Sequence, residues 1–287
     1  MDCVRNRKQR LPAYGYVGLA IILVAEILMF IQVEPVHTYF TAIVWSGYIL
    51  LIDGIIYRIQ GRSLISRRRG EFLLMLFFSL IFWLIFEFYN LFIRNWHYSG
   101  LPEQLWARCL GYAWAFATIL PAILLTARLL EVLGFPRVAV PRVSVSPGFR
   151  WTLIVLGALC LTIPALLPFS IARYLITPIW LGFIFLLDPI NSLRGGWSLL
   201  DDLERGDLSR WIVLFASGII CGILWEFWNY WAGTKWIYAV PFAFGPKIFE
   251  MPLGGFLGFL PFAVECHVIY VFVMTFRRWS WFPEREV

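Results

Sequence analysis

The sequence predicts an all-α polytopic membrane protein with about eight transmembrane helices in two parallel four-helix repeats. Two observations predict this class: 60% of the 287 residues are hydrophobic, and only 15% are charged. A soluble domain averages about 45–50% apolar and about 25% charged residues. The composition excludes an ordinary soluble enzyme, a disordered chain and a secreted disulfide scaffold. The length suits eight spans of about 20 residues with short loops.

Eight apolar stretches are long enough to cross a bilayer. The predicted spans are 13–33, 39–57, 72–93, 105–126, 151–171, 174–190, 211–231 and 253–275. Because the number of spans is even, both termini are expected on the same side of the membrane.

Lys and Arg are distributed unevenly among the predicted loops. One side holds 19 of the 24 basic residues, including Arg5, Arg7, Lys8, Arg10, Arg277, Arg278 and Arg285. The other side holds Arg94, Arg173, Lys235 and Lys247. Basic residues favour the cytoplasmic side of a membrane, so both termini are expected in the cytoplasm. The net charge of +6 is then a property of these loops and does not indicate nucleic-acid binding.

The two halves of the chain carry the same residues in the same order. The first-half set is Trp45, Gly47, Asp53, Glu87, Phe88, Asn90, Trp96 and Tyr98. The matching second-half set is Trp180, Gly182, Asp188, Glu226, Phe227, Asn229, Trp236 and Tyr238. Four spans per copy give both copies one orientation, which predicts a parallel repeat. The expected domains are a first repeat at 1–134, a proline-rich cytoplasmic linker at 135–149 and a second repeat at 150–287.

Acidic residues inside the spans are the main indication of chemistry, because charged groups at this depth are costly to bury. Glu87 and Asn90 are three residues apart and share a helix face, and Glu226 and Asn229 repeat this geometry. The amide is expected to orient the carboxylate, which could act as a general acid. The alternative is that these pairs only bond neighbouring helices together.

Glu265 is the strongest candidate for a proton donor. Alignment of Leu110–Tyr112 with Leu257–Phe259 sets Thr118 against Glu265, so only the second copy carries this acid. His267 lies two residues further on and is expected to point to another side of the helix. It is either a substrate-wall residue or a packing residue.

Other acids lie near the cytoplasmic ends of spans. Asp53 and Asp188 are close to arginine-rich loops, which they could anchor. The run Asp201–Asp207 could imitate a Mg²⁺–diphosphate site. Alternatively, Ser198 begins a capping box that opens a short helix there.

Aromatic residues gather around the predicted acids. They could wall a cavity for an apolar polyene and stabilise a cation in it, or they could form an interfacial belt. The expected substrate-binding residues are Trp225, Trp228, Trp236, Tyr238, Trp96, Tyr98 and His267.

The sequence contains no motif for a metal or an organic cofactor, and none is expected. No two of the three histidines lie within five residues of each other, and none of the five cysteines forms a CxxC pair. There is also no GxxxxGK loop and no dinucleotide-binding fingerprint.

Two stretches resemble known membrane enzymes. Residues Asn95–Glu103, which read NWHYSGLPE, are similar to the small integral-membrane lycopene cyclases, and the stretch from Phe244-Gly245-Pro246 to Glu265 is similar to the membrane carotenoid hydratases. The resemblance implies a cofactor-independent reaction in which membrane-embedded acids protonate a polyene. One difference is that Pro102-Glu103-Gln104 carries one glutamate where the cyclase pattern has two.

These observations favour an integral-membrane enzyme, a lyase or isomerase, that protonates an isoprenoid or carotenoid-like substrate for cyclisation or hydration. The expected catalytic residues are Glu265, Glu226, Glu87, Asn229 and Asn90. The expected partners are membrane lipids and a hydrophobic small molecule, without nucleic acid. Two alternatives remain open: a proton-coupled transporter of a small solute, and a structural membrane subunit without a site.

Overall fold

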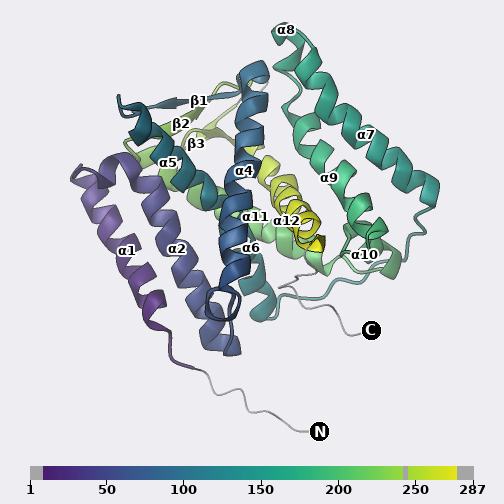
Figure 1. Ribbon diagram of the computed structural model, residues 1–287, viewed down its shortest axis with the longest axis horizontal. Helices are drawn as coiled ribbons and strands as arrows, with labels where there is room; N and C mark the ends of the chain where they lie inside the picture. The colour runs from purple at the N-terminus through teal and green to yellow at the C-terminus, as the bar shows by residue number, and fades with distance from the viewer. Residues whose placement is uncertain (1–8, 242–244, 277–287) are drawn as a thin grey trace. The chain divides into compact units, whose positions relative to one another are not determined.

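The structure is a computed structural model that describes residues 9–241 and 245–276, and about 73% of the chain is helical (Figure 1). The terminal residues Arg5, Arg7, Lys8, Arg277, Arg278 and Arg285, and Phe244 of the hydratase-like stretch, lie outside the described residues.

The helices and strands follow one another in a similar order in the two halves of the sequence. The first half contains α1 (Ala13–Phe30), α2 (Val36–Gln60), α3 (Leu64–Arg67), α4 (Arg69–Ile93), β1 (Trp96–Ser99), α5 (Leu105–Ala117) and α6 (Ile119–Val132). The second half contains α7 (Pro147–Leu166), α8 (Phe169–Ala172), α9 (Ile176–Leu193), α10 (Leu199–Arg205), α11 (Ser209–Trp231), β2 (Lys235–Tyr238), β3 (Lys247–Ile248), β4 (Met251–Pro252), the 3₁₀ helix η1 (Leu253–Gly258) and α12 (Phe259–Thr275).

Eight helical segments in the described part of the chain are long and apolar enough to cross a membrane, as in a multi-pass membrane protein. This confirms the predicted helical class and the expected number of helices that are long and apolar enough to span a membrane. The segments are Ala13–Phe30, Val36–Gln60, Arg69–Ile93, Leu105–Val132, Pro147–Leu166, Ile176–Leu193, Ser209–Trp231 and Leu253–Thr275.

The fifth span begins and ends earlier than the predicted range 151–171. Pro147 lies at the first helical position, where its fixed φ fits and its missing N–H is not needed. At the other end, Leu167 is extended, with φ −91° and ψ 152°. It precedes Pro168, and a residue before proline is pushed out of the helical conformation. The remaining residues of the predicted range contain the separate short helix α8.

The fourth span is interrupted at Thr118, between α5 and α6. Ser79 of α4 inserts its hydroxyl group at this point. It donates to the carbonyl oxygen of Phe116 at 2.5 Å and accepts the N–H of Leu120 at 3.0 Å. A side chain that enters the backbone ladder in this way is a recognised cause of a helix break.

The chain divides into two compact units, neither of which is one continuous half of the sequence. Unit 1 comprises Met1–Ile81, Gly100–Phe135 and Trp228–Lys235, and unit 2 comprises Phe82–Ser99, Pro136–Phe227 and Trp236–Val287. The C-terminal end of α4 therefore belongs to unit 2, whereas the C-terminal end of α11 belongs to unit 1.

In unit 1, α1 packs along α2 at two glycines. A Cβ atom added to Gly18 would lie 2.5 Å from the carbonyl oxygen of Gly47, so neither helix has room for a side chain there. Small residues allow this close approach, which is how helices commonly pack within membranes. Further along α2, the hydroxyl groups of Tyr48 and Thr126 lie 2.7 Å apart and join α2 to α6.

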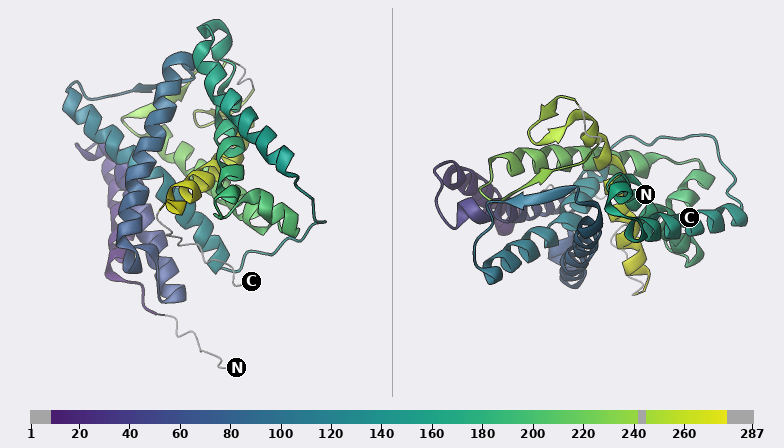
Figure 2. Two further views of the ribbon diagram at one scale, coloured as in Figure 1. Left: turned by 45° about the vertical axis from the view of Figure 1, so that its right-hand side comes forward. Right: turned by 90° about the horizontal axis from the view of Figure 1, so that it is seen from above.

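In unit 2, α7 packs along α9 in the same manner (Figure 2). A Cβ atom added to Gly157 would lie 2.4 Å from the backbone nitrogen of Leu186 and 2.8 Å from the carbonyl oxygen of Gly182. The other side of α9 contacts α12, where the Asn191 amide donates to the carbonyl oxygen of Val268 at 3.0 Å.

Two short ribbons of strands complete the fold. Strands β1 and β2 pair, and we call them the β1–β2 ribbon. Strands β3 and β4 are antiparallel, with Lys247 opposite Pro252 and Ile248 opposite Met251.

The predicted linker 135–149 is irregular as far as Ser146, and its last three residues begin α7. It runs beside α10 and the start of α11. Val140 donates its N–H to the carbonyl oxygen of Gly206 at 2.9 Å, and Val138 donates to the hydroxyl group of Ser209 at 3.0 Å. These bonds hold Val138 and Val140 of the linker against the end of α10 and the start of α11.

We expect Gly157→Ala to lower the midpoint of thermal unfolding in detergent, because the new methyl group must push α7 away from α9. Overpacking of this kind costs about 1–3 kcal/mol. The matched control is Gly254→Ala, where an added Cβ meets nothing within 4 Å. Equal midpoints for the two variants, measured by scanning fluorimetry, would show that the close approach at Gly157 does not stabilise the fold.

Candidate functional site

The two recurring Glu and Trp-x-Tyr motifs meet at the β1–β2 ribbon (Figure 1). Strand β1 follows the end of α4, and β2 follows the end of α11. The backbone N–H of Ala239 donates to the carbonyl oxygen of Asn95 at 2.8 Å, which continues the contact beyond the paired strands. The ribbon therefore lies directly after the two helices that carry Glu87 and Glu226.

Glu87 accepts three hydrogen bonds on one carboxylate oxygen, Oε1. The donors are the hydroxyl group of Tyr98 at 2.5 Å and the indole N–H groups of Trp96 and Trp83, both at 3.0 Å. Tyr98 and Trp96 come from β1, whereas Trp83 lies one helical turn before Glu87. Two of the three donors therefore come from the aromatic residues that follow the acid.

Glu226 is fully buried and has a different arrangement of donors. Its Oε1 accepts the hydroxyl proton of Tyr238 at 2.7 Å, and the Tyr238 oxygen accepts the indole N–H of Trp236 at 2.8 Å. Its second oxygen, Oε2, is buried without a hydrogen-bond partner among the described residues. Burial, together with the charge and the hydrogen bond of Glu226, raises the pKa of Tyr238 well above its usual value. The Tyr238 hydroxyl group therefore remains a donor at neutral pH.

The expectation that Asn90 orients the Glu87 carboxylate is wrong. The Asn90 amide oxygen accepts the backbone N–H groups of Asn95 at 2.9 Å and Trp96 at 3.3 Å, and its nitrogen donates to the carbonyl oxygen of Trp96 at 2.9 Å. Asn90 thus shapes the turn from α4 into β1, because the free backbone groups of a helix end need partners. The predicted counterpart, Asn229, is buried and belongs to unit 1, whereas Glu226 belongs to unit 2.

Glu265 of α12 has no exposed surface, and neither of its carboxyl oxygens has a hydrogen-bond partner in the part of the chain that the structure describes. Leaving a buried polar group unpaired costs about 1–3 kcal/mol, and an unpaired buried charge costs more. Among the candidate acids, Glu265 is therefore the one that contributes least to folding.

An aromatic cluster lies one helical turn from Glu265, around Phe262 on the same side of α12. The ring centroid of Phe262 is 5.8 Å from that of Trp225, 6.0 Å from that of Trp83 and 6.4 Å from that of Trp180. We call these four residues the Phe262 cluster. Its members come from α12, α11, α4 and α9, and Trp83 connects it directly to Glu87.

Two predicted substrate-wall residues have other surroundings. The His267 ring packs edge-on against Trp197 at 4.5 Å, and the Arg210 guanidinium lies 4.4 Å from the same indole ring. Trp228 belongs to unit 1, where its ring lies 4.9 Å from that of Trp45 and its N–H donates to Glu26 at 3.1 Å. The predicted wall residues Trp225, Trp236, Tyr238, Trp96 and Tyr98 all belong to unit 2, with Glu87, Glu226 and Glu265.

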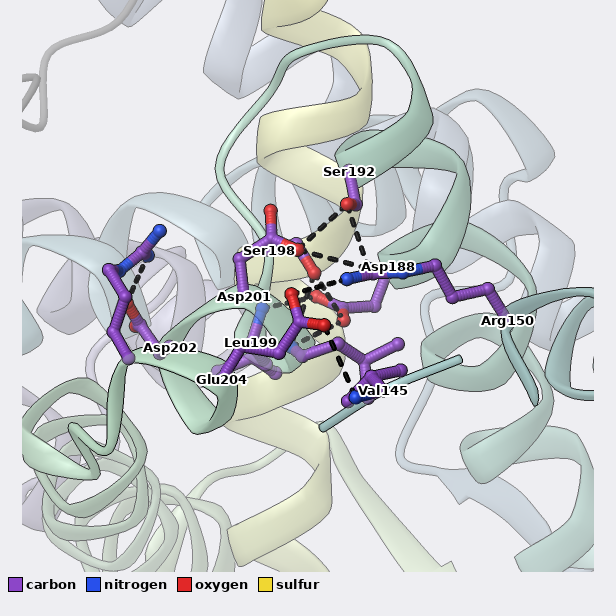
Figure 3. Close-up of polar contacts among 11 residues, drawn as sticks. Val145, Arg150, Asp188, Ser192, Ser198, Leu199, Asp201, Asp202 and Glu204 are labelled. Atoms are coloured by element: carbon purple, nitrogen blue, oxygen red, sulfur yellow. Dashed lines mark hydrogen bonds and ion pairs between the residues drawn. The ribbon is translucent and has the colours of Figure 1, made fainter. Parts of the chain in front are cut away.

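Asp53 and Asp188 anchor the loops that follow their helices, but they do so without arginine. Asp188 accepts the hydroxyl proton of Ser198 at 2.8 Å and the N–H groups of Leu199 and Leu200 at 2.7 and 3.1 Å (Figure 3). Asp53 similarly accepts the N–H of Ile65 at 3.1 Å, as well as the hydroxyl proton of Tyr14 at 2.8 Å. Each aspartate thus satisfies N–H groups at the start of a short helix, α10 or α3.

The acidic run at 201–207 is occupied by ion pairs and capping bonds. Arg150 donates to Asp201 at 2.9 Å and to Glu204 at 2.6 Å (Figure 3). Asp202 pairs with Arg205 at 2.6 Å. Ser198 caps α10 by accepting the N–H of Leu200 at 3.1 Å, whereas Asp201, the second residue of the expected capping box, accepts from Arg150 and Ser192. Within residues 9–241 and 245–276, no group of three or more His, Cys, Asp or Glu could hold a metal ion.

Sequence reasoning missed Trp83, Trp180 and Phe262. Trp83 lies four residues before Glu87 and Phe262 three residues before Glu265, so both share a helix face with a candidate acid. This spacing is the signal that could have found them. For Trp180 the signal is its recurrence in the second half at the position that matches Trp45.

No protein-family model, no curated protein and no solved structure matches this chain. The site must therefore be interpreted from its own geometry.

We expect Glu265→Met to raise the midpoint of thermal unfolding, because methionine removes an unpaired polar group at similar volume. The gain should be of the order of 1–3 kcal/mol. Asp188→Asn is the comparison, and it should lower the midpoint because an amide nitrogen cannot accept the N–H groups of α10. Scanning fluorimetry measures both. A loss of stability in Glu265→Met as large as that in Asp188→Asn would mean that Glu265 is held by a structural contact.

Proposed function

We propose that this chain is an integral-membrane enzyme that protonates a hydrophobic, isoprenoid-like or carotenoid-like substrate, and so starts its cyclisation or hydration. Glu265 carries the proposal, as a fully buried carboxyl group with no hydrogen-bond partner for either oxygen among the described residues. Such a group is a cost to folding, and functional sites are where costs of this kind are retained. The adjacent Phe262 cluster supplies the apolar, aromatic surroundings that a polyene requires.

The proposed chemistry begins with the Glu265 proton. It is transferred to one carbon of a substrate double bond, the π electron pair forms the new C–H bond, and the neighbouring carbon becomes a cation. Indole faces attract a cation by about 0.5–2 kcal/mol each. The cation is then attacked by a second double bond and loses a proton, which gives a ring, or it is captured by water, which gives an alcohol. Glu226 and Glu87 are the candidate acceptors of the returned proton. No oxidant or cofactor enters this scheme.

This reaction is the one implied by the resemblance of Asn95–Glu103 to the small lycopene cyclases and of the stretch ending at Glu265 to the carotenoid hydratases. The partners of the chain would be membrane lipids and an apolar small molecule.

We also propose that the two four-span halves are copies of one another in the same orientation. The order of two spans, a short helix, a span, a strand and a further span recurs in both halves. The supporting contacts recur in pairs: Gly18 with Gly47 and Gly157 with Gly182, Asp53 with α3 and Asp188 with α10, and Glu87 with Tyr98 and Glu226 with Tyr238.

The proposed orientation places both termini in the cytoplasm, because 19 of the 24 basic residues lie in loops on that side. An alkaline phosphatase fused after Val287 should therefore be inactive in a bacterial host, whereas a fusion after Arg173 should be active. The reverse pattern would contradict the orientation, and equal activities would contradict the three spans expected between Arg173 and Val287.

Expression in a host that accumulates lycopene should change the pigment, and Glu265→Gln should abolish the change because the amide cannot donate a carboxylic proton. The expected loss is at least the roughly 10²–10⁴-fold contribution of a general acid. Chromatography of extracted pigments measures it.

Glu34→Gln is the control for this experiment, because Glu34 is exposed and its carboxylate bonds only Thr38. It should leave the pigment change intact. Unchanged pigment with folded wild-type protein in the membrane would rule out a carotenoid substrate. Proton-coupled solute flux into proteoliposomes, with no chemical change in the solute, would favour the transporter instead.

A further inference from the structure

The two Glu–Tyr pairs at the β1–β2 ribbon differ in how their carboxylates are bonded. In the first, Oε1 of Glu87 accepts three donors, Tyr98, Trp96 and Trp83. In the second, Oε1 of Glu226 accepts the hydroxyl proton of Tyr238, and the indole N–H of Trp236 donates to the tyrosine oxygen and also acts on the Glu226 carboxylate. The second pair is therefore a chain from Trp236 through Tyr238 to Glu226, and it ends at a carboxyl group whose other oxygen is open.

One substitution between the halves explains part of this difference. Four residues before Glu87 the chain carries Trp83, whereas four residues before Glu226 it carries Gly222. A Cβ atom at Gly222 would lie 2.3 Å from the Phe259 ring, so Phe259 of α12 occupies the space beside this glycine. The indole donor of the first pair is thus replaced by an apolar ring from the helix that carries Glu265.

The open oxygen of Glu226 is buried, and the charge of Glu250 acts on this carboxyl group. Oε2 is buried and lacks a hydrogen-bond partner among the described residues, and the whole residue has no exposed surface. The preceding residue, Trp225, stacks on Phe259 with ring centroids 6.1 Å apart and contacts Phe262 at 5.8 Å. By contrast, Glu87 is only partly buried.

We propose that Glu226 takes the proton back from the substrate cation, so that the reaction ends in cyclisation or isomerisation and not in hydration. This inference rests on the proposed function. Tyr238 and Trp236 are positioning residues that hold the Glu226 carboxylate, and Glu87 is a structural acid that fastens the ribbon to α4.

The proposed step balances within the chain. Glu265 gives a proton to one carbon, and a carbon next to the resulting cation gives a proton to Oε2 of Glu226. The electron pair of the broken C–H bond becomes the new double bond. The product has the mass of the substrate, and the enzyme is reset when a proton leaves Glu226 and another reaches Glu265.

The first arm of the test compares matched variants with the substrate. Glu226→Gln keeps an acceptor for Tyr238, and it should lower turnover by roughly 10²–10⁴-fold, as expected for loss of a general base. Glu34→Gln, at an exposed acid outside the proposed site, should leave turnover within a few-fold of wild type, and Glu87→Gln should have a smaller effect than Glu226→Gln. Mass spectrometry of the wild-type product should show no added water. A hydrated product, or a larger effect of Glu87→Gln than of Glu226→Gln, would overturn the inference.

Tyr238→Phe and Tyr98→Phe form the second matched pair. Loss of the Tyr238 hydroxyl group should lower kcat with little change in KM and should move the pH profile of turnover, because the hydrogen bond to the base is lost. Tyr98→Phe, which removes a donor from Glu87, should lower kcat and move the pH profile less than Tyr238→Phe does. Identical pH profiles for Tyr238→Phe and wild type would contradict the positioning role.

The last arm needs no substrate, so it separates this inference from the proposed function. Dicyclohexylcarbodiimide is an apolar reagent that adds to carboxyl groups, and peptide mass spectrometry locates the adduct. The wild-type protein in membranes should be modified at Glu226 and not at Glu87. Modification of Glu87 alone, of both equally or of neither would overturn the assignment of Glu226 as the more open carboxyl group of the two at the ribbon. The two hypotheses can fail separately. If the wild-type protein acts on no polyene but Glu226 is still selectively modified, the proposed function is overturned, whereas the assignment of Glu226 as an open carboxyl group stands.

Discussion

Carboxyl groups in an apolar surrounding need hydrogen-bond donors, and this requirement organises the loops of the chain. Asp53 and Asp188 are bonded by the first turns of α3 and α10, which directly follow their own helices. Glu87 and Glu226 are bonded by tyrosines of the strands that follow α4 and α11. In each case at least one donor comes from the next segment of the sequence, and Tyr14 and Trp83 add donors to Asp53 and Glu87 from earlier in the chain. An acid and its hydrogen-bond donor therefore recur together in both halves, because a buried carboxyl group needs a donor to offset the cost of its burial.

Glu265 does not follow this arrangement. Both of its oxygens are buried without a hydrogen-bond partner among the described residues, and the Phe262 cluster, one helical turn away, draws its rings from four helices. A carboxyl group with no donors is unfavourable for folding, whereas the four bonded acids each contribute to it. The four bonded acids thus stabilise the fold, whereas Glu265 does not. This contrast is the reason for proposing Glu265 as the proton donor.

Patterns within one segment could be predicted from the sequence, whereas contacts between distant segments could not. The eight spans follow from apolar stretches of sufficient length, and the cap of Ser198 on α10 follows from local spacing. The recurrence of Glu with Trp-x-Tyr in both halves indicates that these residues act together. The sequence does not show the partner of Asn90, because the backbone N–H groups of the turn after α4, which its amide oxygen accepts, are brought to it only when the chain folds. The break at Thr118 depends on Ser79 from another helix. The Phe262 cluster likewise depends on how four helices pack, which no local pattern specifies.

The β1–β2 ribbon has a consequence for the synthesis of the protein. Strand β1 emerges from the ribosome four spans before its partner β2. Until β2 arrives, β1 is a lone strand with unpaired backbone groups at the membrane surface, because a single strand is not stable alone. Completion of the ribbon is thus among the last folding events, and contacts between residues so far apart in the chain form slowly. A nascent chain stopped after the first four spans would present Trp96 and Tyr98 on an unfinished edge, where chaperones or other strands can bind it.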